Sequence, residues 1–281
     1  MTEFEKIVFG KSCIPALIVA VLLMIAIPVA FFLYWRGKHK KQTRLRWLIL
    51  GAVGFLVSAR VLELGVHYFC IIADNPVSRF LEGSTAAYVL YGTVTAGVFE
   101  ECGRHIVLKY LLKKDRTREN AVLYGIGHGG IEILAVVLPT MFVYLVVAVL
   151  FSRGNAENAL SSLKITEQTA AAALPTVQAA AAFDYGMTAM NVLERLFAML
   201  LQIGLTVVVY YGVVNAKKGC LPAAILLHML TDALPALYQR GAVPLWSVEV
   251  WTALCCAGIV LIAGKLYRNM EDRPPLGETA S

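Results

Sequence analysis

Long apolar runs dominate this chain of 281 residues and restrict what it can fold into. The first extends from Ile14 to Tyr34, and several others exceed the roughly 18–20 residues that cross a bilayer as a helix. Hydrophobic residues make up 58% of the chain, more than a water-soluble domain of this length needs for its core. The sequence therefore predicts an all-α fold, a polytopic transmembrane helical bundle that forms a single integral membrane domain over residues 1–281.

We expect about seven spans, separated by short loops. Their approximate bounds are Ile14–Tyr34, Trp47–Ala73, Ala86–Leu112, Ala121–Leu150, Asn191–Asn215, Cys220–Tyr238 and Leu245–Leu266, followed by a short polar tail. The stretch 152–190 is polar and rich in alanine, and Pro175 interrupts its mildly apolar part. We expect an interfacial segment there. An eighth span in this stretch would reverse the orientation of everything after it.

The distribution of Lys and Arg predicts the orientation of the bundle. Sixteen of them follow the first, third, fifth and seventh spans, and six lie at the N-terminus and after the other spans. Because cytoplasmic loops collect Lys and Arg, this bias predicts an outside N-terminus and a cytoplasmic C-terminus. The net charge of +6 is explained by this pattern, so we expect a multi-pass protein of the cell membrane, in contact with lipid and not with nucleic acid.

The segment Phe99-Glu100-Glu101-Cys102-Gly103-Arg104 interrupts the third apolar run. Each such charge costs about 2.5–3.5 kcal/mol near the centre of a membrane helix. Arg104 follows both carboxylates by about one helical turn, so it can neutralise one of them. The other carboxylate is then available as a general base. We expect Glu101 to be that base, because it lies one residue closer to the predicted cytoplasmic side.

Two histidines are predicted at the depth of this pair. His128 lies in Gly-Ile-Gly-His-Gly-Gly-Ile-Glu, and His228 begins His-Met-Leu-Thr-Asp. Each has a carboxylate one turn later, Glu132 and Asp232 respectively. We expect His128 to position a water, with Glu132 as its orienting partner, and His228 with Asp232 to stabilise an oxyanion. The alternative is a set of unrelated polar residues in the core.

A further polar group and a possible metal site complete the candidates. Arg60, Glu63 and His67 share one helical face, and we expect Glu63 to pair with Arg60. The chain contains neither an HExxH motif nor a GxSxG motif. A zinc site made from His128, His228 and Glu101 is still open, since catalytic zinc takes three protein ligands.

Together these motifs resemble a known group of membrane enzymes. A Glu-Glu pair followed by Arg, then a His, then His-x3-Asp is similar to the CPBP group of glutamic-type intramembrane proteases, which includes the CAAX-processing endopeptidases. The closer resemblance is to the bacterial YhfC family of intramembrane peptidases, through Glu100-Glu101-x2-Arg104, Gly127-His128-Gly129-Gly130-x-Glu132 and His228-x3-Asp232. The CPBP pattern usually has three residues between the second Glu and Arg, and this chain has two. The difference leaves open which Glu matches the catalytic one.

The resemblance implies an endopeptidase that hydrolyses a peptide bond in or near the bilayer. Its presumed catalytic core covers residues 86–238, with a glutamate-activated water, no cofactor, and a membrane-embedded or membrane-proximal protein substrate. A zinc-dependent peptidase that uses the same residues is the alternative enzyme. A non-catalytic scaffold or a proton-coupled transporter is the alternative of another class, although paired repeats typical of transporters are not evident in the sequence.

Overall fold

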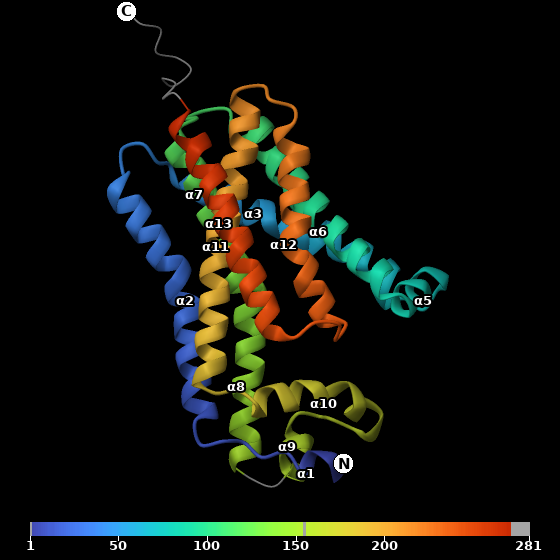
Figure 1. The fold of residues 1–281 in the computed structure, drawn as a ribbon. Coiled ribbons are helices and arrows are strands. Elements are labelled where there is room, and N and C mark those ends of the chain that lie inside the picture. The colour runs from blue at the N-terminus through green and yellow to red at the C-terminus, as the bar shows by residue number, and fades with distance from the viewer. Residues whose placement is uncertain (1, 154–155, 271–281) are drawn as a thin grey trace, which may run out of the picture. The chain divides into compact units, whose positions relative to one another are not determined.

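The computed structural model describes residues 2–153 and 156–270, and each regular element in this part of the chain is a helix (Figure 1). The N-terminal half contains α1 (Thr2–Glu5), α2 (Cys13–Lys38), α3 (Leu45–Phe55), η1 (Leu56–Glu63), α4 (Leu64–His67), η2 (Tyr68–Ile72), α5 (Pro76–Gly83), α6 (Thr85–Ile106), η3 (Val107–Leu111) and α7 (Arg118–Glu132). The remainder contains η4 (Ile133–Val137), α8 (Leu138–Arg153), α9 (Ala156–Ser162), α10 (Glu167–Ala181), α11 (Tyr185–Val214), α12 (Cys220–Gln239) and α13 (Leu245–Arg268). Residues 271–281 of the predicted polar tail lie outside the described residues.

Six helical stretches are long and apolar enough to cross a membrane, so the chain is a multi-pass membrane protein. They are Cys13–Lys38, Leu45–Ile72, Arg118–Arg153, Tyr185–Val214, Cys220–Gln239 and Leu245–Arg268, which match six of the seven predicted spans. The seventh, α6 with η3, is a helix of sufficient length, but its charged residues set it apart from the other six. The seven-span topology and its orientation stay predictions.

The chain divides into two compact units, which we call unit 1 and unit 2. Unit 1 comprises residues 1–27 and 133–195, and unit 2 comprises residues 28–132 and 196–281. In unit 1 the predicted interfacial segment forms α9 and α10, and Thr166 caps α10 through a capping box with Thr169. Apolar side chains of these two helices pack with Phe4 and Val147 in a buried cluster of unit 1. α9 and α10 are therefore packed on their own unit.

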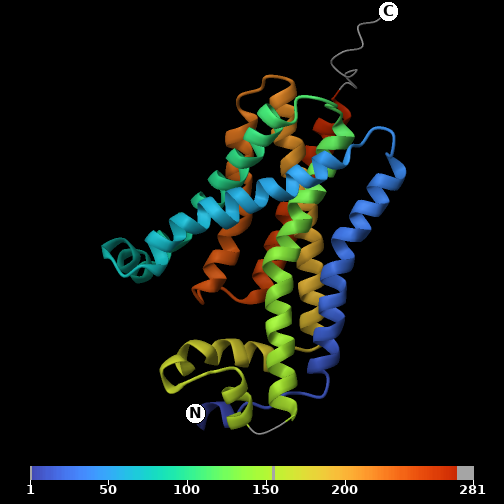
Figure 2. The ribbon, with the colours of Figure 1, turned by 180° about the vertical axis from the view of Figure 1, so that it is seen from behind.

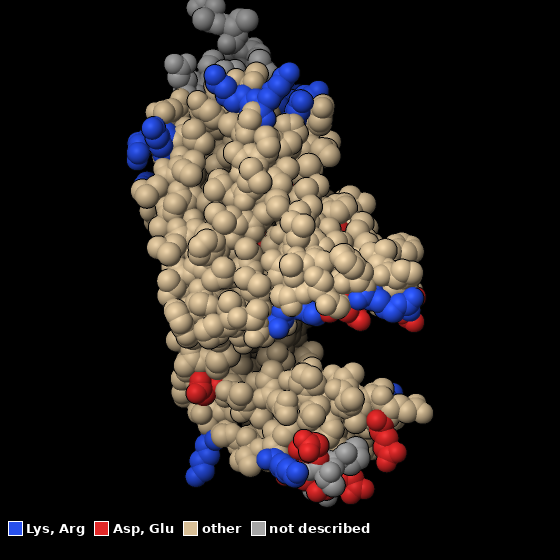
Figure 3. Space-filling view, turned by 45° about the vertical axis from the view of Figure 1, so that its right-hand side comes forward, with Lys and Arg blue, Asp and Glu red and all other residues tan. Residues whose placement is uncertain are grey.

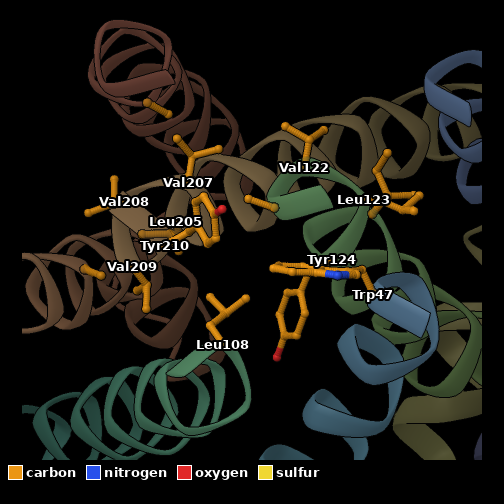
Figure 4. Close-up of a cluster of buried hydrophobic side chains, with 14 of the residues drawn as sticks. Trp47, Leu108, Val122, Leu123, Tyr124, Leu205, Val207, Val208, Val209 and Tyr210 are labelled. Carbon is orange, nitrogen blue, oxygen red and sulfur yellow. The ribbon is translucent and has the colours of Figure 1, made fainter. Parts of the chain in front are cut away.

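Unit 2 is built around two pairs of packed helices. α3 packs along α7, and α6 packs along α12; Figure 2 shows the first of these crossings. In Figure 4, Trp47 of α3, Leu108 of η3 and Tyr124 of α7 point into one buried cluster with residues of α11. Trp47 and Tyr210 meet edge to face with ring centroids 5.9 Å apart. This core packs α7, α11 and α12 together with η3, which continues α6.

The surface of unit 2 suits a lipid environment. Figure 3 shows Lys and Arg at the top of this unit and, together with Asp and Glu, along its lower edge, with a broad surface of few charged side chains between them. Large apolar residues such as Leu254 and Leu261 on α13 are 63% and 74% exposed. Exposed apolar side chains of this size, repeated along a helix, are what lipid chains would cover.

Glycine permits the close crossing of α3 and α7. A Cβ atom at Gly127 would collide with the backbone carbonyl of Leu48, and one at Gly51 would collide with the carbonyl of Tyr124. The two backbones are therefore in direct contact, which is possible only without side chains at these positions. This contact accounts for part of the glycine-rich sequence around His128 and fixes the position of α7 beside α3.

Candidate active site

Three helices of unit 2 bring five ionisable groups into one buried cluster. α6 supplies Glu100, Glu101 and Arg104, α7 supplies His128, and α12 supplies His228. All five residues are less than 9% exposed. Burial of so many charged groups is costly unless they are paired, so their mutual contacts determine what the cluster can do.

Arg104 lies at the centre of the cluster and is fully buried. Its Nε atom lies 3.0 Å from Oε2 of Glu101, an ion pair without hydrogen-bond alignment, and Nη2 donates to Oε1 of Glu101 at 3.2 Å. Nη1 donates to the Gln202 carbonyl at 2.9 Å and to the Thr206 hydroxyl. Nη2 also donates to the Gln202 side-chain oxygen. Arg104 is thus held by two helices, and Glu101 is its counter-charge.

Glu101 also orients His228. Oε1 of Glu101 lies 2.8 Å from Nδ1 of His228. The opposite ring nitrogen, Nε2, faces two other carboxylates, at 4.0 Å from Oε2 of Glu100 and 3.4 Å from Oδ2 of Asp232. Gly97 allows this arrangement, because a Cβ there would lie only 3.0 Å from the Ile225 carbonyl oxygen of α12. A carboxylate that holds one imidazole nitrogen leaves the other directed at the reacting groups.

Glu100 is the carboxylate that both histidines approach. Its Oε2 lies 3.0 Å from Nε2 of His128 and accepts a hydrogen bond from Nε2 of Gln202 at 3.2 Å. Nη2 of Arg104 lies 3.3 Å from the same nitrogen of His128. The sequence favoured Glu101 as the base, whereas in the structure Glu101 is occupied by Arg104 and Glu100 lies between the two imidazoles. This geometry favours Glu100.

Gln202 of α11 belongs to the cluster and is absent from the sequence-derived candidates. Its side-chain amide donates to Glu100 and, at 2.9 Å, to Oε2 of Glu132. Glu132, which we expected to orient His128, reaches the cluster through this amide. A polar residue inside the run Leu-Leu-Gln-Ile was the available sequence signal for Gln202.

Asp232 connects the cluster to a cavity. Its side chain is 36% exposed, in contrast to the fully buried carboxylate of Glu101. It lines a cavity of about 300 Å³ that also borders η1, α4, η2 and α6. A substrate in this cavity would therefore meet Asp232 and, behind it, His228 and Glu100.

The donor types suit a metal ion such as zinc. Two imidazoles and one carboxylate form a common catalytic zinc set, and its ligand atoms lie about 3.3–3.6 Å apart around the ion. The separations of Glu100 Oε2 from Nε2 of His128 and His228, 3.0 and 4.0 Å, bracket that spacing. Within residues 2–153 and 156–270, however, no three such side chains are arranged to hold an ion as they stand. Metal binding would replace the contact between Nε2 of His128 and Oε2 of Glu100, because both atoms would become ligands. The metal set expected from the sequence, with Glu101 in place of Glu100, stays a prediction.

A second histidine–carboxylate pair lies apart from the cluster, on η1 and α4. Nε2 of His67 is 3.3 Å from Oε1 of Glu63, and Nδ1 of His67 is 2.8 Å from the Tyr91 hydroxyl. Glu63 therefore pairs with His67, whereas the sequence suggested Arg60, which is exposed. Tyr91 lies on α6, so its contact with His67 could not be predicted from residue spacing within one helix.

Comparisons with known proteins identify a family and a relative of this chain. The family model of the YhfC intramembrane metalloproteases matches residues 23–252. The membrane protein YhfC of Bacillus subtilis (strain 168) is 29% identical over 232 residues, which cover 82% of this chain and 87% of that protein. No solved structure matches the chain.

Proposed function

The chain belongs to the YhfC intramembrane metalloprotease family, and from this membership and the geometry we propose that it hydrolyses peptide bonds at the Glu100–His228 cluster with the help of a divalent metal. The observation that carries the proposal is the approach of two histidines, from α7 and α12, to one oxygen of Glu100. The family's description favours the metal-dependent form of the enzyme over a metal-free one.

His128, His228 and Glu100 are the residues that would hold the ion. When bound, zinc would polarise the peptide carbonyl and make a water molecule easier to deprotonate. Hydrogen bonds from two neighbouring side chains keep these ligands in place. Glu101 holds Nδ1 of His228, and Gln202 holds the Glu100 side chain. Such supporting bonds orient the ligands and influence their affinity for the ion.

Asp232 is the carboxylate best placed to move protons in this form of the reaction, because it is partly exposed in the cavity and lies beside His228. It accepts a proton from the attacking water as the oxygen–carbon bond forms. It then returns a proton to the amine that leaves as the carbon–nitrogen bond breaks. Water supplies both the hydroxyl of the new acid and the proton of the new amine, so the hydrolysis balances.

One observation favours a metal-free mechanism as the second candidate. Oε2 of Glu100 already lies 3.0 Å from Nε2 of His128, an arrangement that suits a water-activating base. In that mechanism Glu100 takes the proton from water, His128 positions the water, and His228 with Asp232 stabilises the oxyanion.

The test measures zinc content and cleavage of a transmembrane reporter by the purified protein, with and without a chelator. We expect about one zinc per chain, and a loss of cleavage in chelator that added zinc restores. Glu100→Gln should lower the zinc content together with activity, whereas the exposed-site control Glu82→Gln should change neither. Full cleavage in chelator by zinc-free protein, abolished by Glu100→Gln, would instead support the metal-free mechanism.

A further inference from the structure

The cavity beside the cluster is not used by the proposed chemistry except through Asp232. Its volume is about 300 Å³, large enough for a long side chain together with part of the backbone that carries it. Its walls come from η1, α4, η2, α6 and α12, all within unit 2. Because Asp232 lies on its wall and contacts His228, anything bound in the cavity lies next to the proposed reacting groups.

The walls of this cavity carry negative charge. Glu63 and Asp232 both line it, and the residues that form its described wall include no Lys or Arg. The groups that face these carboxylates are His67 and His228, at 3.3 and 3.4 Å. An imidazole carries a positive charge only when protonated, so neither carboxylate has a permanently charged partner on this wall.

The tyrosines of the cavity also suit a cation. The rings of Tyr88 and Tyr91 both contribute to the wall. The Tyr91 hydroxyl is bound to His67, and the Tyr88 hydroxyl donates to the Gln239 side chain at 3.1 Å. The faces of tyrosine rings attract Lys and Arg, and the guanidinium of Arg240 already lies 5.1 Å from the Tyr88 ring. An anionic side chain in the same space would meet two carboxylates at close range.

We propose that this cavity binds a lysine or arginine side chain of the substrate, close to the scissile bond. The inference rests on the proposed function, in that the adjoining cluster is taken as the site of cleavage. The ligand class follows from a polar cavity with two buried or half-buried carboxylates, tyrosine faces and enough volume for a long cationic side chain. Such a pocket would make the peptidase select basic residues in otherwise apolar segments.

The experiment measures binding of fluorescent apolar peptides to the Glu100→Gln protein in detergent, so that cleavage does not interfere. The peptides differ at one position, which is lysine, norleucine or glutamate. We expect the lysine peptide to bind roughly tenfold more tightly than the norleucine peptide, the size of one hydrogen bond to a charged group. Adding Glu63→Gln should reduce this ratio to about twofold or less, whereas adding Glu82→Gln should leave it unchanged.

A second variant fills the cavity without touching a charge. A Cβ at Gly92, on the cavity wall, would have no atom within 4 Å, and the same is true at Gly65, an exposed position off that wall. Gly92→Leu should therefore weaken binding of the lysine peptide at least fivefold, and Gly65→Leu should not. Both changes place the same side chain in a helix, so their difference reports on the cavity.

Equal binding of the lysine and norleucine peptides would overturn the inference, even for a protein that cleaves reporters well. A lysine preference that survives both Glu63→Gln and Gly92→Leu would also overturn it, because the cation would then bind elsewhere. A preference that both variants remove, in a protein whose unsubstituted form cleaves no reporter, would support the cavity and contradict the proposed peptidase.

Discussion

Two carboxylate–histidine pairs in unit 2 have very different surroundings. Glu100 and His128 are enclosed by Arg104, Gln202 and a second carboxylate, with His128 itself completely buried. Glu63 and His67 instead face a cavity, and the Tyr91 hydroxyl is bound to the second nitrogen of His67. The first pair is held from several helices and suits chemistry that needs fixed geometry. The second can adapt to a ligand.

The largest expected effect concerns the two adjacent glutamates and separates chemistry from support. Glu100→Gln should reduce reporter cleavage by about a thousandfold or more. The zinc-free variant should unfold at the same temperature as the zinc-free unsubstituted protein or higher, because a buried charge is removed. Glu101→Gln should lower the unfolding temperature, because Arg104 then loses its counter-charge. Cleavage rates and thermal unfolding in detergent measure both. Two fully active variants would mean that neither carboxylate takes part in catalysis.

Replacing Arg104 should lower the stability of the protein more than replacing any other residue of the cluster. Arg104→Met removes the group that Glu101 and Gln202 share, and an unpaired buried carboxylate costs about 3–5 kcal/mol. Denaturant unfolding in detergent gives the free energy. Arg60→Met, on the exposed side of η1, is the matched control and should cost little. If both arginines behave alike, Arg104 is in contact with water and the cluster is not buried.

The crossing of α3 and α7 should be sensitive to a single methyl group. Gly127→Ala is expected to cost about 1–3 kcal/mol, because the Leu48 carbonyl occupies the space of the new atom. Cleavage should fall as well, since His128 is the next residue and would move with α7. Gly65→Ala meets no neighbouring atom and is the control. An unfolding curve unchanged by Gly127→Ala would contradict the backbone contact.

The smallest effect is expected at the Glu63–His67 pair beside the cavity. Tyr91→Phe removes one hydrogen bond to His67 and should cost about 1 kcal/mol of stability. It should leave the zinc content unchanged, because His67 is not among the proposed ligands. Tyr110→Phe, at an exposed tyrosine, provides the comparison. A large loss of zinc or stability on Tyr91→Phe would show that the two pairs are not as separate as we infer.

The helices and most of the cluster were predictable because their signals are local. Apolar runs gave the helix positions, and one-turn spacing in the sequence linked Arg104 to the Glu pair and Asp232 to His228. The identity of the carboxylate that faces His128 was not predictable, because it depends on the rotation of α6 against α7. The contribution of Gln202 comes from α11, about a hundred residues away in sequence. Segments η1 to η4 are π-helical and have more residues per turn than an α-helix. They shift the helical register locally, which spacing rules for α-helices do not anticipate.

The contact between α3 and α7 bears on how this chain can diverge during evolution. Because backbone meets backbone at Gly51 and Gly127, enlarging one position cannot be compensated by shrinking a facing side chain. Lineages that descend from this sequence should therefore accumulate few changes there. The cavity walls are formed by side chains, so a change in the size of one can be compensated by a change in another. More substitutions should therefore accumulate there. Selectivity for substrates is thus free to evolve more quickly than the geometry that places His128.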